Sequence, residues 1–292
     1  MHVDEVPTDA DLVRGLLARQ FPQWAHLSLE PVISAGTDNA LYRLGSDMTV
    51  RLPRIRWAVD AVDKEYTWLP QLAPLLPVAV PVPLVRGVPG NGFPWPWTIC
   101  RWLEGANPVA ASIDQSEAMA ADIARFVLAL REIDPGGGPA SNRGEPLATR
   151  DHPTRAAIAA LEGNLDTELA TALWDEALLA PAWSGPPLWI HGDLGPLNLL
   201  CSDGRLTGVI DFGTMGVGGP ACDLIPAWNL FPASSRSRFR DELGADEATW
   251  TRSRGWALSI ALIQLPYYVD TNPVLAAGAV HVIEQILIEG SH

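Results

Sequence analysis

Residues 188–213 read LWIHGDLGPLNLLCSDGRLTGVIDFG, and no other part of the chain is as informative. Three side chains in this stretch carry oxygen at spacings that suit one reaction: Asp193, Asn198 and Asp211. Phosphoryl transfer needs one carboxylate to accept or orient a hydroxyl proton. It also needs an Asn and a second carboxylate to hold Mg²⁺ against nucleotide phosphates. The pattern His-Gly-Asp-Leu-x-x-x-Asn followed by Asp-Phe-Gly therefore predicts a phosphoryl-transfer site of the kinase type.

The segment between Asn198 and Asp211 has the pattern of a β-hairpin. Short strands at 199–201 and 206–210 can be joined by the Ser-Asp-Gly turn at 202–204. Such a hairpin would bring Asp211 back beside Asn198, which is what a shared metal site requires.

Length and composition indicate a folded protein with a sizeable core. The chain has 292 residues and is 48% hydrophobic and 18% charged, which is a globular composition. Its 20 basic and 34 acidic residues give a net charge of −14, so nucleic acid is not expected as a partner. The acidity favours a cationic small molecule, although surface acid that only aids solubility explains most of these residues equally well.

The cysteines and the hydropathy pattern indicate in which cellular compartment the protein is expected. Cys100, Cys201 and Cys222 are scattered and form no CxxC pair, which is typical of a reducing compartment. No basic start followed by an apolar segment is present, and no apolar run reaches about 18 residues. We therefore expect a soluble, cytoplasmic monomer or homodimer with no membrane partner.

The pattern of secondary structure changes near Gly105, which predicts an α+β fold of two lobes. Residues 1–104 predict a β-rich lobe, with a helix that begins near Thr8 and strands at 29–34, 40–44 and 48–52. A helix is expected at 57–72, with Val59, Val62, Tyr66 and Leu69 on one face. Residues 105–292 predict a larger helical lobe, with helices at 116–133, 153–180, 236–270 and 273–289.

On these residues the chain resembles the aminoglycoside phosphotransferase family, which has the protein-kinase-like bilobal fold, and the likeness covers nearly the whole length. The resemblance implies a nucleotide-binding lobe at 1–104 and a lobe with catalytic loop and substrate pocket at 105–292. It also implies transfer of the γ-phosphate of ATP or GTP, with Mg²⁺, to a hydroxyl of a small molecule. Antibiotics and small metabolites are the acceptors in this family.

The resemblance also assigns roles in the catalytic stretch. Asp193 corresponds to the catalytic base, and Asn198 with Asp211 would hold Mg²⁺, because this ion prefers oxygen ligands. His191 resembles a structural residue packed under the loop. Asp223 resembles the family aspartate that braces the loop from behind.

The nucleotide phosphates usually meet a strand lysine that is paired with a helix glutamate. The strand 48–52 carries Arg51 instead, and Glu65 in the following helix is the candidate partner. Lys64, the single lysine, lies in the same helix as Glu65 and is not expected to substitute. Arg54 and Arg56 compete with Arg51 for the phosphate role.

Two further segments of the first lobe resemble nucleotide-binding parts of the family. Residues 34–39 resemble the loop over the phosphates, with Gly36, Thr37 and Asn39 as binding residues, although an ordinary turn gives the same sequence. In residues 98–105, the Arg101 carbonyl and the Leu103 N–H would contact the edge of the nucleotide base.

Two features depart from the family pattern. Gly195-Pro196-Leu197 stands where His-Pro-Gly is common, and Gly219 replaces an aspartate before proline. Both could loosen the loop and weaken activity, and with Arg51 in place of lysine they motivate a nucleotide-binding pseudoenzyme as an alternative. Protein kinase activity is disfavoured, because only nine residues separate Gly213 from Asp223.

The acceptor is the least determined part of the prediction. An aminoglycoside-type antibiotic fits the acidic charge, and the alternative is a metabolite kinase that acts on a choline-like or homoserine-like amino alcohol. The tail carries Tyr267, Asp270 and Glu284, which we expect to line the acceptor pocket, with Trp256 either beside them or in the core.

Overall fold

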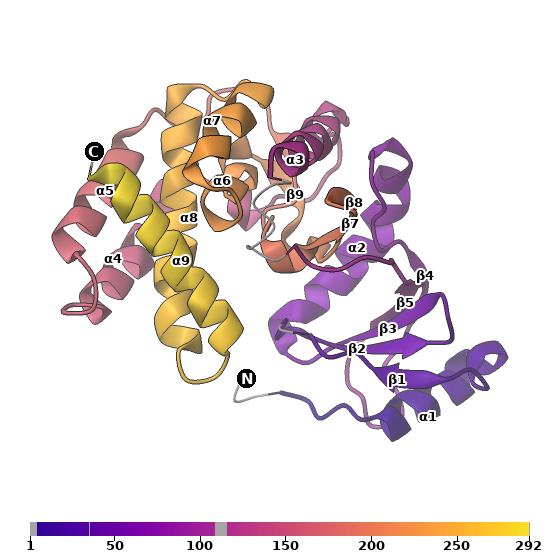
Figure 1. The fold of residues 1–292 in the computed structure, drawn as a ribbon. Coiled ribbons are helices and arrows are strands. Elements are labelled where there is room, and N and C mark those ends of the chain that lie inside the picture. Colours follow the sequence, from indigo (N-terminus) through magenta and orange to yellow (C-terminus); the bar gives the residue numbers. More distant parts are fainter. Residues whose placement is uncertain (1–4, 35, 109–115, 292) are drawn as a thin grey trace. The chain divides into compact units, whose positions relative to one another are not determined.

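The computed structural model describes residues 5–34, 36–108 and 116–291 (Figure 1). By its internal contacts the chain divides into two compact units. The first unit is Met1–Gly105 with Thr207–Gly213, and the second is Ala106–Leu206 with Thr214–His292. The first is built around a sheet and the second is mostly helical, so the predicted α+β class is correct. The assignment of nucleotide and acceptor binding to separate lobes stays a prediction.

An antiparallel sheet of five strands, ordered β1-β2-β3-β5-β4, forms the centre of the first unit. Its strands are β1 (Leu29–Pro31), β2 (Asn39–Leu44), β3 (Met48–Pro53), β4 (Pro83–Gly87) and β5 (Trp97–Arg101). In β3 buried residues alternate with half-buried ones, so Val50 and Leu52 enter the core while Arg51 lies on the opposite face. Burial of Val50 and Leu52 therefore fixes the register of β3 and keeps Arg51 on the face of the sheet that lies away from this core.

The helices of the first unit are α1 (Ala10–Gln20) and α2 (Val59–Leu72), with short 3₁₀ turns η1 (Pro22–Trp24), η2 (Arg56–Ala58) and η3 (Ala73–Leu75). The N-cap of α1 is Asp9, one residue after the predicted Thr8, and its carboxylate accepts a hydrogen bond from Leu12 N. The predicted apolar face of α2 is partly wrong, because Tyr66 is exposed. Glu65 takes its place on the buried face, where an ion pair compensates the charge.

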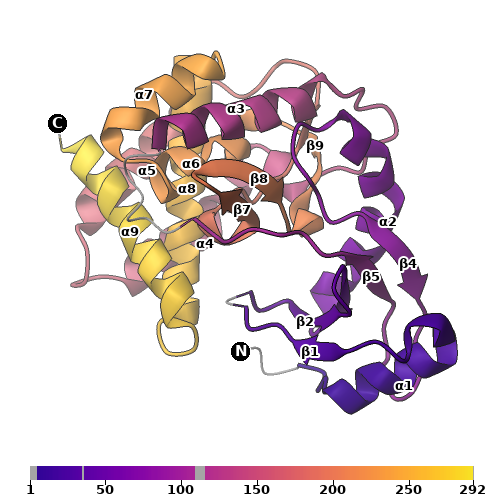
Figure 2. The same cartoon turned by 45° about the vertical axis from the view of Figure 1, so that its right-hand side comes forward.

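The second unit contains eleven helical segments among the residues that the structure describes. They are α3 (Ser116–Glu132), η5 (Asn142–Gly144), η6 (Leu147–Arg150), α4 (Asp151–Ala160), α5 (Thr167–Leu179), η7 (Pro196–Asn198), η9 (Pro220–Leu224), α6 (Pro226–Asn229), α7 (Ala233–Glu242), α8 (Glu247–Tyr268) and α9 (Pro273–Gly290). The two long C-terminal helices, α8 and α9, lie side by side (Figure 1, Figure 2). Glycine breaks two helices that the sequence predicts as continuous. The helix expected at 153–180 is interrupted near Gly163, and that expected at 236–270 near Gly244; both glycines have positive φ.

Two small sheets frame the catalytic stretch. Strand β6 (Leu188–Ile190) pairs antiparallel with β9 (Gly216–Gly218). Strands β7 (Leu199–Ser202) and β8 (Arg205–Val209) form the predicted hairpin, whose turn has positive φ at Asp203 and Gly204. The boundary between the two units falls within β8, between Leu206 and Thr207. The return of Asp211 to the neighbourhood of Asn198 stays a prediction.

Helix α9 has the length and mean hydropathy of a membrane-spanning segment, although its apolar residues form no uninterrupted run of about 18. Only 28% of its 18 residues are buried inside the protein. Its buried residues are Ala276, Ala279, Val282, Ile283 and Ile286. The core helix of a soluble protein passes the same test, so α9 is weak evidence for a membrane span.

Candidate active site

In the first unit Arg51 is held by two carboxylates. Its Nη1 donates to Glu65 Oε2 at 2.5 Å and its Nη2 donates to Asp211 Oδ1 at 2.9 Å. Glu65 is only 3% exposed, whereas Asp211 is 44% exposed. Burial alone would lower the pKa of Arg51, but the carboxylates of Glu65 and Asp211 outweigh it and raise the pKa. The structure thus brings together three residues that the sequence predicts for nucleotide and metal binding.

Asn39 lies at the start of β2, beside Arg51. In the amide orientation that matches donors with acceptors, its oxygen accepts from Arg51 Nε and Nη2 at 3.2 and 3.1 Å. In the structure the Asn39 side chain contacts the guanidinium group. Its predicted place in a phosphate loop stays a prediction.

The sequence predicts no role for Lys64, yet its side chain lies in this site. Its Nζ donates to the carbonyl of Gly213 at 2.5 Å, which ties α2 to the segment that carries Asp211. Burial lowers the pKa of Lys64, while the charges of Glu65 and Asp211 oppose that shift. The sequence signal for this contact is the position of the single lysine directly before the predicted glutamate.

Asp211 has a backbone φ of +62°, which few residues other than glycine adopt. It follows β8 and precedes the short turn η8 (Phe212–Thr214), whose Phe212 is buried. Strained backbone of this kind persists where surrounding contacts enforce it and is frequent at functional sites. Here those contacts are the Arg51 ion pair and the Lys64 hydrogen bond to Gly213.

Of the other predicted nucleotide-binding residues, Gly36 and Thr37 lie in the connection between β1 and β2, and Leu103 follows β5. Gly36 N donates to Ser34 Oγ at 3.0 Å, and Thr37 Oγ1 donates to Asp38 Oδ1 at 3.1 Å; Ala35 lies outside the described residues. Arg101 ends β5. Within residues 5–34, 36–108 and 116–291, Leu103 N–H donates to no backbone carbonyl. Roles for Gly36, Thr37, Arg101 and Leu103 stay predictions.

In the second unit, Asp223 anchors the backbone that leaves β6. Its Oδ2 accepts from His191 N at 2.9 Å and its Oδ1 from Gly192 N at 2.7 Å. Burial raises the pKa of Asp223, while the charge of His191 and these N–H groups oppose the shift. Gly192 is required at its position, because its φ is +82° and a Cβ would lie 2.9 Å from Arg143 Cβ. The loop is therefore fixed just before Asp193.

His191 is fully buried and supports the same loop. Its Nδ1 accepts a hydrogen bond from Asp193 N at 3.2 Å, and its carbonyl accepts from Thr214 Oγ1 at 2.8 Å. Ser141 Oγ in turn donates to the Thr214 carbonyl at 2.7 Å. These contacts make His191 a positioning residue for Asp193.

Asp193 and Asn198 are directly linked. Asn198 Nδ2 donates to Asp193 Oδ2 at 3.0 Å and to the Asp193 carbonyl at 2.9 Å. Because the amide nitrogen serves Asp193, the Asn198 Oδ1 atom remains available to a metal ion, and its role as a ligand stays a prediction. An amide oxygen here and the exposed Asp211 carboxylate are hard oxygen donors of the kind that Mg²⁺ takes together with phosphates. Among the described residues, no three His, Cys, Asp or Glu side chains form a metal-binding cluster.

The two departures from the family pattern are not imposed by the backbone. Gly195 and Gly219 have ordinary negative φ values of −141° and −72°. A Cβ at either position would meet its nearest neighbour at 3.6 or 3.4 Å, respectively. Whether these residues weaken activity stays a prediction.

The residues predicted to bind the acceptor lie at the end of the second unit. Tyr267 is in the last turn of α8, Asp270 is in the α8–α9 connection and Glu284 is on α9, and all three are exposed. Their contact with an acceptor stays a prediction. Trp256 is only 2% exposed and belongs to the core of the unit.

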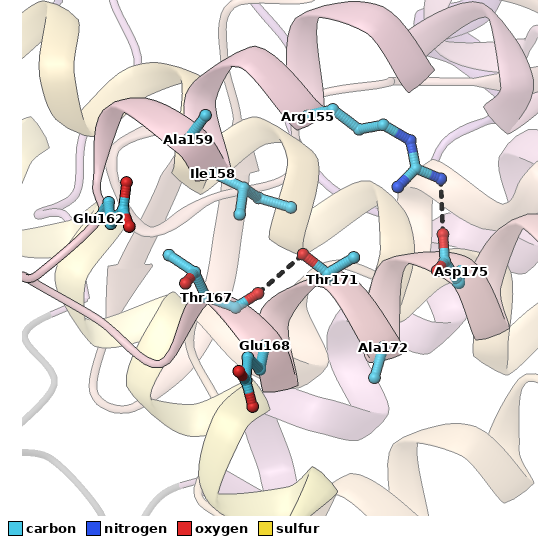
Figure 3. Close-up of a pocket in the computed structure, with 9 residues that line it drawn as sticks. All are labelled: Arg155, Ile158, Ala159, Glu162, Thr167, Glu168, Thr171, Ala172 and Asp175. Carbon is cyan, nitrogen blue, oxygen red and sulfur yellow. Dashed lines mark hydrogen bonds and ion pairs between the residues drawn. The ribbon is translucent and has the colours of Figure 1, made fainter.

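A hollow between α4 and α5 contains none of the predicted site residues (Figure 3). Its lining residues are Arg155, Ile158, Ala159, Glu162, Thr167, Glu168, Thr171, Ala172 and Asp175. Arg155 is paired with Asp175 across it at 2.5 Å. We therefore place the site at the catalytic loop and not at this hollow.

Several solved structures share this fold over nearly their whole length. The GDP complex of wild-type aminoglycoside 2'-phosphotransferase-IIIa is 20% identical, with 97% of this chain and 99% of that chain covered and a TM-score of 0.75. ADP-bound APH(2'')-Ib is 16% identical, with 95% and 98% covered and a TM-score of 0.62. The macrolide 2'-phosphotransferase MphH from Brachybacterium faecium is 24% identical, with 96% and 97% covered and a TM-score of 0.63.

The model of the phosphotransferase enzyme family matches residues 31–256, which is well over half of the chain. The chain belongs to this family. No curated protein matches it.

Proposed function

We propose that the protein transfers the γ-phosphate of ATP or GTP to a hydroxyl of a small molecule. The hydroxyl oxygen forms a bond to the γ-phosphorus while the bond from that phosphorus to the β-phosphate oxygen breaks. The nucleoside diphosphate leaves, and the hydroxyl proton passes to the carboxylate of Asp193. Asp193 thereby aligns the acceptor in line with the phosphorus, which supplies much of the catalysis in such reactions.

The nucleotide half of the reaction falls to the first unit in this proposal. Arg51, oriented by Glu65 and Asn39, binds the non-transferred phosphates, and Lys64 supplies a second positive charge close by. Asn198 and Asp211 would hold Mg²⁺, which neutralises phosphate charge in a protein whose own net charge is −14. Without a cation, a protein of this charge repels a nucleotide.

The observation that carries the proposal is the hydrogen bond between Asn198 and Asp193. Together with the double anchor of Asp223 on the preceding backbone, it fixes a potential base and a potential metal ligand in one rigid loop. A non-catalytic nucleotide binder has no chemical need for such an arrangement.

Two acceptor classes have support. Net charge, the exposed Asp270 and Glu284, and the likeness to aminoglycoside phosphotransferases favour an aminoglycoside-type antibiotic. A second candidate is a hydroxylated metabolite. One observation favours it: Arg143 and Arg150, beside the catalytic loop, have no carboxylate partner among the described residues and could bind an anionic group of such a compound. We also propose that the protein is cytoplasmic and acts as a monomer or homodimer.

A screen of nucleotide turnover over aminoglycosides, macrolides and amino alcohols, with ATP and GTP in parallel, tests the proposed function. Asp193→Ala provides the blank and Asp193→Asn the variant of equal size. We expect kcat to fall by about 10²–10⁴-fold in both variants, because a positioned base contributes that much. Nucleotide affinity, measured separately, should stay within about twofold, since Asp193 acts on the acceptor. Acceptor-dependent turnover that persists in Asp193→Asn would contradict the proposal.

A further inference from the structure

Arg143 and Arg150 lie next to the catalytic loop, within the second unit. The backbone N–H of Arg143, in η5, donates to Ser141 Oγ, which itself donates to the Thr214 carbonyl. The Cβ and Cγ atoms of Arg143 pack against the space where Gly192 has no side chain. Gly192 directly precedes Asp193, so the arginine stem lies beside the residue before the proposed base.

The thiol of Cys222 shows independently that these charges gather in one region. Cys222 Sγ donates to the Gly192 carbonyl at 3.3 Å and is fully buried. Burial raises its pKa, and the charges of Arg143, Asp223, Asp193 and Arg150 all act on it. Both guanidinium groups and the Asp193 carboxylate are therefore within electrostatic reach of the same buried atom.

Trp256 holds the two arginine side chains. The guanidinium carbon of Arg143 is 5.9 Å from the centroid of this indole ring, and that of Arg150 is 5.5 Å from it. Arg150 Nε also donates to Ser259 Oγ at 3.1 Å, and Ser259 is bonded to Thr154 at 2.7 Å. Aromatic and hydroxyl contacts of this kind fix the side chains without neutralising their charge.

Most other arginines of the unit are neutralised by acids. Seven are paired with a carboxylate within 3.1 Å, and they are Arg125, Arg155, Arg205, Arg236, Arg238, Arg240 and Arg254. Arg131 and Arg252 donate to main-chain carbonyls. Among the residues that the structure describes, neither Arg143 nor Arg150 forms an ion pair with a carboxylate.

This arrangement is costly unless something compensates it. Arg143 Nη1 is buried and has no hydrogen-bond acceptor among the described residues. Burial, followed by the like charge of Arg143, lowers the pKa of Arg150 to about 10. An anion placed against these groups would supply the missing acceptor and remove the repulsion, since guanidinium forks bind carboxylates and phosphates with paired hydrogen bonds.

We propose that Arg143 and Arg150 form an oxyanion subsite for the acceptor, so that the physiological acceptor is a hydroxylated compound that also carries a carboxylate or phosphate group. The inference rests on the proposed function and narrows it. It separates the metabolite candidate from cationic antibiotics and from choline-like alcohols, which have no anionic group to offer these arginines.

A binding experiment tests the subsite without turnover. The full-length protein is titrated calorimetrically with malonate and, as the neutral match, with malonamide. We expect malonate to bind about tenfold or more tightly than malonamide, and Arg143→Gln and Arg150→Gln to remove the difference. Arg143→Gln keeps the stem atoms that pack against Gly192, and Arg143→Lys keeps the charge and should keep part of the preference. The control is Arg155→Gln, in the hollow between α4 and α5, which should bind malonate as the parent does.

Equal binding of malonate and malonamide by the parent, or unchanged malonate binding in both glutamine variants, would overturn the subsite. Circular dichroism and the unfolding midpoint of each variant show whether it is folded. Where Arg143→Gln does not fold, Arg150→Gln and Arg143→Lys decide the question.

A turnover experiment tests the consequence for the acceptor and separates the two proposals. Hydroxy acids are compared with their amides, as in glycerate against glyceramide and serine against serinamide. We expect acids to be preferred by about tenfold or more in kcat/KM, and the preference to vanish in Arg143→Gln through KM. A protein that phosphorylates amides or aminoglycosides as well as acids would refute the subsite and leave the proposed function standing. Malonate binding lost in the glutamine variants, with no turnover of any acceptor, would support the subsite and refute the proposed function.

Discussion

The arginines beside the proposed site residues are held in opposite ways in the two units. In the first, Arg51 has two carboxylates and an amide oxygen around it, so its charge is satisfied by the protein itself. In the second, Arg143 and Arg150 rest on Trp256 and have no carboxylate partner among the described residues. In the first arrangement the protein itself balances the arginine charge and fixes the orientation of the guanidinium group. The second is incomplete and suits recognition.

The largest expected effect comes from breaking the first arrangement. Arg51→Ala leaves Glu65 charged and buried, with its Oε1 already lacking a partner among the described residues. Removing one partner of a buried pair costs about 3–5 kcal/mol, so we expect a loss of that size in the free energy of unfolding measured in urea. Nucleotide affinity should fall as well.

Glu65→Gln provides the control for Arg51→Ala, because it removes the partner's charge and keeps its shape. The double variant Arg51→Ala/Glu65→Gln should recover part of the lost stability, since no unpaired charge then remains buried. Arg51→Ala with parental stability and parental nucleotide affinity would show that the paired arginine has neither role.

A smaller loss is expected at the anchor of the catalytic loop. Asp223→Asn keeps one oxygen acceptor for the N–H groups of His191 and Gly192, where the carboxylate offers two. One buried donor then has no acceptor, which costs about 1–3 kcal/mol of unfolding free energy. Because Asp193 loses its fixed position, kcat should fall by about 10²-fold while nucleotide affinity stays nearly constant. An unchanged kcat would show that this anchor does not position the base.

The smallest expected effect concerns Asp122 of α3, which fixes the start of β8. Its carboxylate accepts from Arg205 Nε and Nη2, both at 2.7 Å, and from Leu206 N at 3.2 Å. The hydrogen bonds from Arg205 lower the pKa of Asp122. Asp122 is 4% exposed but Arg205 is 58% exposed, so solvent screens the pair and Asp122→Asn should cost about 1–2 kcal/mol at pH 7.

The pH dependence at Asp122 has a defined sign. A carboxyl whose pKa is lower in the folded than in the unfolded state stabilises the fold above its unfolded pKa of about 3.9. That stabilisation is lost as the pH falls through the folded value. The difference in unfolding free energy between the parent and Asp122→Asn should therefore shrink below about pH 4. A difference that is constant from pH 7 to pH 3 would exclude this charge as its source.

How much the sequence predicts depends on whether the decisive contacts are local. The strands around Arg51, the helix that carries Glu65 and the hairpin after Asn198 follow from alternation, helical spacing and turn residues close in the chain. Arg51 and Glu65 are paired as the sequence predicts. Their role in nucleotide binding stays a prediction, as do the roles of all the site residues.

The features that the sequence did not reveal depend on packing between distant segments. Helical periodicity continues through the breaks near Gly163 and Gly244, because apolar spacing does not record where a glycine turns the chain. Arg143 reaches Gly192 and Trp256 from far along the sequence, and no local pattern connects these three residues. In α2, Glu65 is buried and Tyr66 is exposed, because Glu65 forms an ion pair with Arg51. Hydrophobic spacing alone does not predict a buried charged residue.

Asn198 in the second unit and Asp211 in the first are proposed to hold one divalent ion together with the nucleotide. Electron paramagnetic resonance of Mn²⁺, titrated into the protein with ADP present, measures that joint binding directly. We expect Asn198→Ala and Asp211→Asn each to weaken Mn²⁺ binding by about tenfold or more, while the exposed control Asp270→Asn binds as the parent does. Parental Mn²⁺ affinity in either Asn198→Ala or Asp211→Asn would contradict a shared metal site.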